Sequence, residues 1–248
     1  MHLKTIQASA LKTCFEVLKD VLHDVNLFFT STGITITALD NAKVALINMR
    51  LCAENFEEYS CAQPVTAGVN ISNLFKLFKI ITTSDVLDID ITGKDTMNIT
   101  IENATKNSKT KFDYKLLWIN EDVLSIPTVE RQSTTILPSV DFQRICRDMG
   151  NLSEDVKIIR DHNLVRFSCN GDFANQTTNI DTEQDDFEGV VGNTYPLKYI
   201  NLFTKATSMC STMKIHISEP TETIPIIFVY NIANLGEIEF FLAARSDD

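Results

Sequence analysis

The sequence predicts an α+β fold made of two similar halves. Short β-branched segments dominate it, and clusters of Gly, Asn, Asp and Thr separate them. Only four segments have the spacing of an amphipathic helix, and the order of elements in the first half returns in the second. With 44% apolar residues among 248, the chain can bury a sizeable core.

The predicted strands alternate in polarity or run apolar over a few residues. They are Ile34–Leu39, Val44–Leu51, Val86–Ile91, Met97–Ile101, Val156–Ile159, Leu164–Ser168, Met213–Ile217 and Ile224–Tyr230. Two further strand segments, Lys109–Leu117 and Phe173–Ile180, contain no proline.

The predicted helices each carry one apolar face, because their apolar residues recur at three- and four-residue spacing. They are Ala10–Asp20, Ser72–Ile80, Val140–Met149 and Leu197–Ala206. Ser9, Ser72 and Ser139 are expected to cap three of them, and Pro196 suits the first turn of the fourth.

The helix core positions superpose between the two halves. A shift of 131 residues carries Leu11, Cys14, Phe15 and Leu18 onto Phe142, Ile145, Cys146 and Met149. A shift of 126 carries Ile71, Leu74, Leu77 and Lys79 onto Leu197, Ile200, Phe203 and Lys205. This indicates a duplicated unit, with domains at 1–114 and 132–248 and a connector at 115–131.

The connector is unusually apolar and holds Trp118, the only tryptophan of the chain. Connections of this length are usually functional. The alternative is that the segment simply packs on its own domains.

The net charge of −11 argues against a nucleic-acid partner, but the distribution of charge reverses that argument. Each predicted helix carries two basic residues away from its apolar stripe, which favours a polyanion-facing surface over ordinary solvation of exposed helices. The surface has no array of base-reading amides, so we expect sequence-independent, salt-sensitive phosphate contacts. The eight residues are Lys12, Lys19, Lys76, Lys79, Arg144, Arg147, Lys198 and Lys205.

No phosphate-binding, dinucleotide, zinc-protease or hydrolase motif is present. The four histidines are isolated and the six cysteines are scattered, so we expect reduced thiols, no metal, no cofactor and no enzymatic activity. Asp85, Asp88 and Asp90 could form a metal-binding cluster, but their alternation with apolar residues is typical of a half-solvated strand. No apolar run approaches the ~20 residues of a membrane span.

Several stretches resemble the eukaryotic-type DNA sliding clamps, the proliferating cell nuclear antigen family. They are LKTCFEVLKD (11–20), GVNISNLFKLFK (68–79), FQRICRDMG (142–150), LKYINLFTKAT (197–207) and PIIFVYNIANLGEIEFFLA (225–243). The resemblance runs over almost the whole chain.

The resemblance implies two α+β domains with antiparallel sheets, and three subunits closed head to tail into a ring around duplex DNA. The eight basic residues would line the channel. Subunits would meet through the strand with Phe112 and Tyr114 and the strand with Phe173 and Thr177. The partners implied are double-stranded DNA, DNA polymerase and other proteins with clamp-interacting peptides, a clamp loader ATPase and the chain itself, in the nucleus or a viral replication compartment.

The family also implies a hydrophobic groove for partner peptides. The matching positions are Leu39, Lys43, Val44, Leu46, Leu116, Leu124, Ile126, Pro127, Pro225, Phe241, Ala243 and Ala244.

Three departures qualify the resemblance. Lys43 replaces a polar or histidine residue, Trp118 and Ile119 make the connector more apolar, and His162 stands where relatives carry a ubiquitin-modified lysine. A specialised clamp, monomeric or heterotrimeric and acting in damage signalling, is the main alternative; a non-clamp polyanion-binding scaffold is another.

Overall fold

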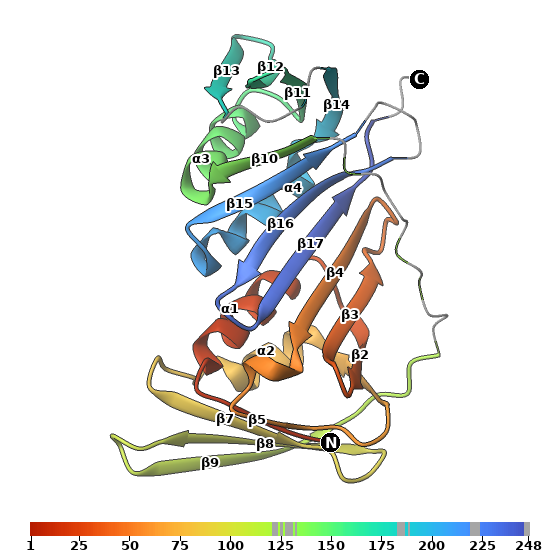
Figure 1. The fold of residues 1–248 in the computed structure, drawn as a ribbon, viewed down its shortest axis with the longest axis vertical. Coiled ribbons are helices and arrows are strands. Elements are labelled where there is room, and N and C mark those ends of the chain that lie inside the picture. Colours follow the sequence, from red (N-terminus) through yellow and green to blue (C-terminus); the bar gives the residue numbers. More distant parts are fainter. Residues whose placement is uncertain are drawn as a thin grey trace. The chain divides into compact units, whose positions relative to one another are not determined.

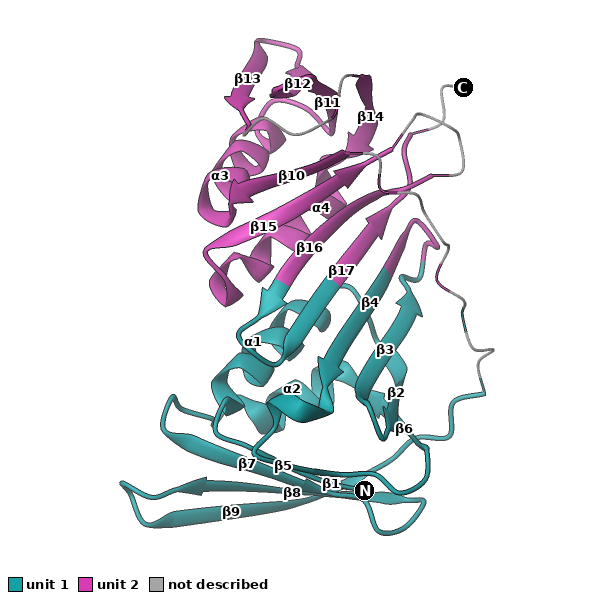
Figure 2. Cartoon of the chain, viewed as in Figure 1, with its two compact units in different colours: residues 1–41, 47–125, 231–238 teal, residues 42–46, 126–230, 239–248 magenta. Residues whose placement is uncertain are grey.

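The computed structural model describes residues 1–120, 124, 126, 131, 133–182, 187, 189–218 and 224–245. These residues form two compact units, shown in Figure 2. Unit 1 comprises residues 1–41, 47–125 and 231–238, and unit 2 comprises residues 42–46, 126–230 and 239–248. Strands β4, β16 and β17 are divided between the two units.

The first half of the chain contains strands and two helices (Figure 1). The elements are β1 (His2–Thr5), α1 (Ala8–Leu18), β2 (Asp24–Thr30), β3 (Gly33–Leu39), β4 (Ala45–Cys52), a 3-10 turn (Ala53–Asn55), β5 (Glu58–Ser60), β6 (Val65–Asn70), α2 (Ile71–Phe78), β7 (Asp85–Asp90), β8 (Thr96–Asn103) and β9 (Ser108–Lys115).

The second half repeats the order. Its elements are β10 (Ser133–Pro138), α3 (Ser139–Gly150), β11 (Asp155–Asp161), β12 (Leu164–Asn170), β13 (Asn175–Asp181), β14 (Val190–Pro196), α4 (Leu197–Phe203), a 3-10 helix (Thr204–Met209), β15 (Thr212–Ile217), β16 (Ile226–Ile232) and β17 (Gly236–Leu242).

The observed sheets are antiparallel in every pairing whose register is defined. In unit 1, a five-stranded sheet has the order β5-β1-β7-β8-β9, and a second set runs β4-β3-β2-β6. In unit 2, a four-stranded sheet has the order β13-β12-β11-β14, and β10-β15-β16-β17 form the second set. Strands β9 and β13 are therefore each at the edge of a sheet.

The helices pack through the apolar positions that the sequence predicts. The buried residues of α1 include Leu11, Cys14, Phe15 and Leu18, and those of α3 are Ser139, Phe142, Ile145, Cys146 and Met149. The shift of 131 residues thus relates buried positions. In α2 the pattern deviates by one residue, because Phe78 is buried and Leu77 is half-buried.

Aromatic rings join the helices to the core of each unit. In unit 1, Phe15 of α1 meets Phe78 of α2 edge-on, with ring centroids 5.2 Å apart. In unit 2, Phe203 of α4 stacks on Phe240 of β17 at 4.5 Å, and Phe142 of α3 stacks on Phe228 at 5.5 Å. Such contacts hold each helix against its strands.

The predicted serine caps are wrong, because each serine lies inside its helix. Asn70 caps α2 instead, accepting a hydrogen bond from the amide of Asn73 at 2.9 Å. Ser139 is buried and its hydroxyl donates to the carbonyl of Cys210, which fixes the start of α3 to the segment before β15. Pro196 directly precedes the first residue of α4.

Candidate functional site

The predicted basic residues lie on the solvent-facing sides of their helices or just beyond them. Lys76, Arg144, Arg147 and Lys198 lie within α-helices and are exposed. Lys19 and Lys79 occupy the C-cap positions of α1 and α2, and Lys205 lies in the 3-10 helix after α4. The prediction that the four α-helices themselves carry all eight residues is therefore too broad, because three of the helices end earlier than the pattern indicated.

Lys12 is half-buried, and its ammonium contacts the backbone of another segment. Its ammonium donates to the carbonyl of Ile81 at 2.8 Å, which ties α1 to the segment after α2. Lys12 thus has a structural contact that the sequence did not predict.

Several of the remaining cations have neighbours on their own segment. Lys19 pairs with Asp20 at 2.7 Å, and Arg144 pairs with Asp141 at 3.3 Å. Exposed pairs of this kind contribute little to stability and are screened by salt. The side chains can therefore exchange such partners for a phosphate at small cost.

The strand edges proposed for subunit contact are open edges of their sheets. Thr177 is exposed in the middle of β13, and Phe112 is half-buried in β9. Phe173 precedes β13 and does not belong to it, which corrects the prediction; its side chain is 80% exposed.

Tyr114 faces its own unit. Its hydroxyl accepts a hydrogen bond from the amide of Asn70 at 3.0 Å and donates to the carbonyl of the same residue at 3.3 Å. Burial raises the pKa of Tyr114. The side chain therefore supports the N-terminus of α2, a role that its place on an edge strand did not reveal.

A small apolar cluster in unit 2 gathers part of the predicted groove. Leu46 and Ile126 pack against a buried centre formed by Ile227, Val229 and Phe241. The sequence missed Ile227 and Val229 as groove residues, although their apolar run predicted a strand. Phe241 is only 4% exposed, so it forms the floor beneath Leu46 and Ile126.

The other predicted groove residues have varied exposure. Leu39 is 37% exposed, while Leu116 and Leu124 are half-buried in unit 1. In unit 2, Val44, Pro225 and Ala244 are half-buried, and Lys43 and Ala243 are exposed. Pro127 lies outside the described residues.

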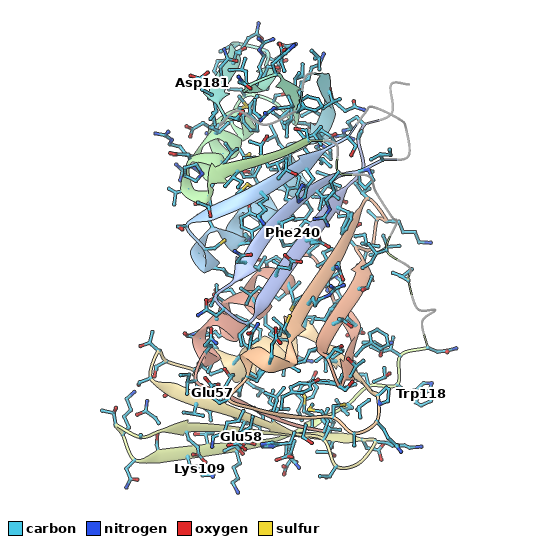
Figure 3. All side chains as sticks on the ribbon, in the orientation of Figure 1. Glu57, Glu58, Lys109, Trp118, Asp181 and Phe240 are labelled. Atoms are coloured by element: carbon cyan, nitrogen blue, oxygen red, sulfur yellow. The ribbon has the colours of Figure 1, made fainter. Side chains whose placement is uncertain are left out.

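The start of the connector is fixed to unit 1. The amide of Leu117 donates to the carbonyl of Gly68 at 2.8 Å, and the side chain of Asn26 donates to the carbonyl of Ile119 at 3.3 Å. Between these anchors Trp118 is 94% exposed and projects from the trace in Figure 3. The indole is thus exposed although the backbone on both sides of it is anchored.

A polar network lies farther along the connector, in unit 2. Arg131 donates to the buried carboxylate of Glu239 at 2.5 Å and lies 3.2 Å from Nε2 of His216. Burial and the charge of Arg131 lower the pKa of His216 to about 4. His216 is therefore neutral at physiological pH, and the network holds the end of the connector.

The acidic residues of β7 divide between two faces. Asp85 is buried, accepting hydrogen bonds from Thr82 and Asn103, whereas Asp88 and Asp90 are half-exposed beside His2. One potential ligand atom from each of His2, Asp88 and Asp90 lies within 4.8 Å of the others. Asp85 is thus separate from this group, and the three-aspartate cluster considered from the sequence does not form.

His162, which stands where the resemblance places a modified lysine, lies in a tight turn. His162 lies between β11 and β12 with a left-handed φ of 48°, and its Nδ1 is 2.8 Å from a carboxylate oxygen of Asp161.

No described helix is long and apolar enough to cross a membrane.

Family models match the entire span of these features. The model of the N-terminal domain of proliferating cell nuclear antigen matches residues 1–124, and that of the C-terminal domain matches residues 125–245. The chain belongs to the proliferating cell nuclear antigen family. It is therefore a DNA sliding clamp, and the expected α+β fold with two similar domains is confirmed.

Curated relatives agree with this assignment. The chain is 35% identical over 254 residues to the probable DNA polymerase sliding clamp 1 of Paramecium bursaria Chlorella virus 1, covering 98% of this chain and 95% of the relative. It is 32% identical over 253 residues to the proliferating cell nuclear antigen of Chaetomium thermophilum, covering 98% and 96%. Sliding clamps are non-catalytic processivity factors, which agrees in outline with the expectation of a non-enzymatic protein.

Proposed function

We propose that three copies of this chain close head to tail into a ring that encircles duplex DNA and tethers a DNA polymerase. The observation that carries the proposal is the repeated pair of helices, because both helical segments of each half present basic residues. A ring holds DNA by topology, so its phosphate contacts can remain weak and mobile.

The proposed channel residues are Lys19, Lys76, Lys79, Arg144, Arg147, Lys198 and Lys205, with Lys12 contributing charge from its fixed position. Their charges would face the duplex although the chain as a whole is acidic. The subunits would join β9 of one copy to β13 of the next, a head-to-tail contact that closes at three. A separate clamp loader ATPase would open the ring.

Partner proteins would dock through short peptides on the apolar cluster of unit 2 and the connector beside it. The residues proposed for this groove are those assigned from the sequence, with Ile227 and Val229 added. We retain 1–114 and 132–248 as the two clamp domains and 115–131 as the connector. The nucleus or a viral replication compartment is the corresponding location.

The test is retention on DNA of a variant in which Lys19, Lys79 and Arg147 are changed together to Glu. A loader would place the clamp on a nicked circular plasmid, and the bound clamp would be measured before and after the plasmid is cut. We expect the wild type to remain on circles and leave linear DNA, and the variant to be retained poorly and to stimulate polymerase less. The control changes the exposed Lys94, Lys106 and Lys157 to Glu.

Equal retention of the helix variant and the control would contradict the channel assignment. A monomer in light scattering of the wild type would favour the specialised clamp over the homotrimer.

A further inference from the structure

A cavity with both polar and apolar lining residues lies in unit 2. Its volume is about 920 Å³, and four segments line it. They are the end of α3 with the loop after it, the first turn of α4, the residues following β17, and the pair Lys43 and Val44. All of these segments belong to the same compact unit.

The cavity wall is rich in cations. Lys43, Lys198 and Arg245 line it, and Glu154 is the one carboxylate among the described lining residues. Lys43 and Lys198 are exposed, and Lys43 has a left-handed φ of 57°. The net charge of the chain is −11, so a cavity lined by three cations is a locally positive region of an acidic protein.

Arg245 is fixed where it lines the cavity. Its backbone amide donates to the carbonyl of Thr194 at 2.8 Å, and its Nε donates to Asp155 at 2.8 Å. The charge of Arg245 is therefore partly balanced. Lys43 and Lys198 remain the groups best placed to meet an incoming anion.

Two chain segments run from the cavity to the apolar cluster. The amide of Ala243 donates to the carbonyl of Val44 at 3.2 Å, and both residues line the cavity. Two residues along each segment, Leu46 and Phe241 belong to the cluster. Because two residues of an extended chain span about 7 Å, a peptide anchored on the cluster reaches the cavity within a few residues.

We propose that this cavity receives an acidic side chain, aspartate or glutamate, that flanks the apolar anchors of a partner peptide. The inference rests on the proposed peptide groove and adds the chemistry of the partner's flank. The carboxylate would lie between the ammonium groups of Lys43 and Lys198, where a charge-assisted contact is stronger than a neutral hydrogen bond. Lys43 would then select partners by charge.

A DNA phosphate is the competing anion, because Lys198 is also a proposed channel residue. The chemistry of the wall favours a peptide. Glu154 lines the cavity and Asp155 lies against Arg245, so a run of phosphates would meet carboxylates, whereas a single carboxylate can contact the cations alone.

The test uses three labelled synthetic peptides that share one set of clamp-binding apolar anchors. One carries glutamates before the anchors, the second carries them after the anchors, and the third has glutamine at all of these positions. Affinities are measured by fluorescence anisotropy for the full-length wild type, for Lys43→Ala with Lys198→Ala, and for Lys94→Ala. Lys94 is an exposed lysine of unit 1 outside the cavity.

We expect one acidic peptide to bind the wild type about 5- to 10-fold more tightly than the glutamine peptide at low salt, from two partly exposed ion pairs. The double variant should reduce this preference to less than about twofold. Lys94→Ala should retain the preference, and high salt should weaken it.

Equal binding of all three peptides to the wild type would overturn the proposal while leaving the groove intact. Absence of binding by every peptide would instead contradict the proposed groove itself. If the double variant kept the preference but lost retention on circular DNA, the two lysines would belong to the DNA surface and the peptide assignment would be wrong.

Discussion

The carbonyl of Gly68 and the amide of Leu117 are joined by a hydrogen bond of 2.8 Å that only a glycine at position 68 permits. A Cβ atom added there would lie 2.2 Å from the carbonyl oxygen of Leu117, closer than any real contact. The chain thus fixes the start of its connector by a close approach of two backbones.

Gly68→Ala should detach the start of the connector. Trp118, the only tryptophan, reports this directly, and we expect its fluorescence anisotropy to fall while the stability drops by about 1–3 kcal/mol from the overpacked contact. Gly93→Ala is the control, because a Cβ there would meet nothing within 4 Å. Unchanged anisotropy in Gly68→Ala would show that the connector start is held by other contacts.

Ile126→Asp should abolish the binding of clamp-interacting peptides. A carboxylate at this position would lie against Ile227, Val229 and Phe241, and burying an unpaired charge in an apolar site is costly. Calorimetry should show loss of peptide affinity with the domain still folded by circular dichroism. Ile6→Asp, at an exposed isoleucine of unit 1, should bind as the wild type does; equal affinity in both variants would exclude Ile126 from the groove.

Phe173→Glu should weaken trimer formation, because Phe173 is 80% exposed beside an open sheet edge and large exposed aromatic side chains often mark interfaces. Successive amides of a strand point to opposite sides, so one of Thr177 and Thr178 directs its amide away from β12. Thr177→Pro and Thr178→Pro therefore extend the test, because one of the two variants removes this outward amide. Light scattering at low micromolar concentration gives the readout.

Val190→Glu changes the opposite edge of the same sheet, at a residue that is 61% exposed. It should remain trimeric. If Phe173→Glu, Thr177→Pro and Thr178→Pro all remained trimeric, the interface would lie elsewhere. Tyr114→Ala is less suitable than these changes, because it removes the two hydrogen bonds to Asn70 and should destabilise unit 1.

His216 should make unit 2 less stable as the pH falls from 6.5 towards 4. Its folded pKa is lowered to about 4 from 6.5, first by burial and then by Arg131 and Lys214, against the opposing effect of Glu239. Between these values the unfolded chain binds the proton and the folded chain does not, so stability falls by up to about 1.4 kcal/mol per pH unit. Denaturant unfolding at several pH values should show a smaller slope in this window for His216→Gln.

The helices were predictable because their buried positions depend on local periodicity. Leu11, Phe15, Phe142 and Cys146 are buried as the repeat indicated. The caps were not predictable, because Asn70 competes with Ser72 two residues further on, and the choice depends on where β6 ends. Several strands, including β2, were not predicted. The segment VNLFF of β2 lacks alternating polarity because successive residues are buried on both faces.

The candidate site was only partly predictable for a similar reason. The sequence indicated that the connector end and the last strand would meet, and Ile126 does pack beside Phe241. It could not reveal that Ile227 and Val229 supply the same cluster, nor that Tyr114 turns inward to Asn70. These contacts depend on which strands become neighbours, which is set by the whole fold.

The repeat relates the pairing of β4 and β17 within one chain to the contact proposed between subunits. By order, β4 corresponds to β13 and β17 to β9. Strands β17 and β4 lie side by side: the amide of Cys52 donates to the carbonyl of Leu235 at 2.9 Å, and that of Ala243 donates to Val44 at 3.2 Å. Each chain thus contains an internal template for the seam that β9 and β13 would form between copies.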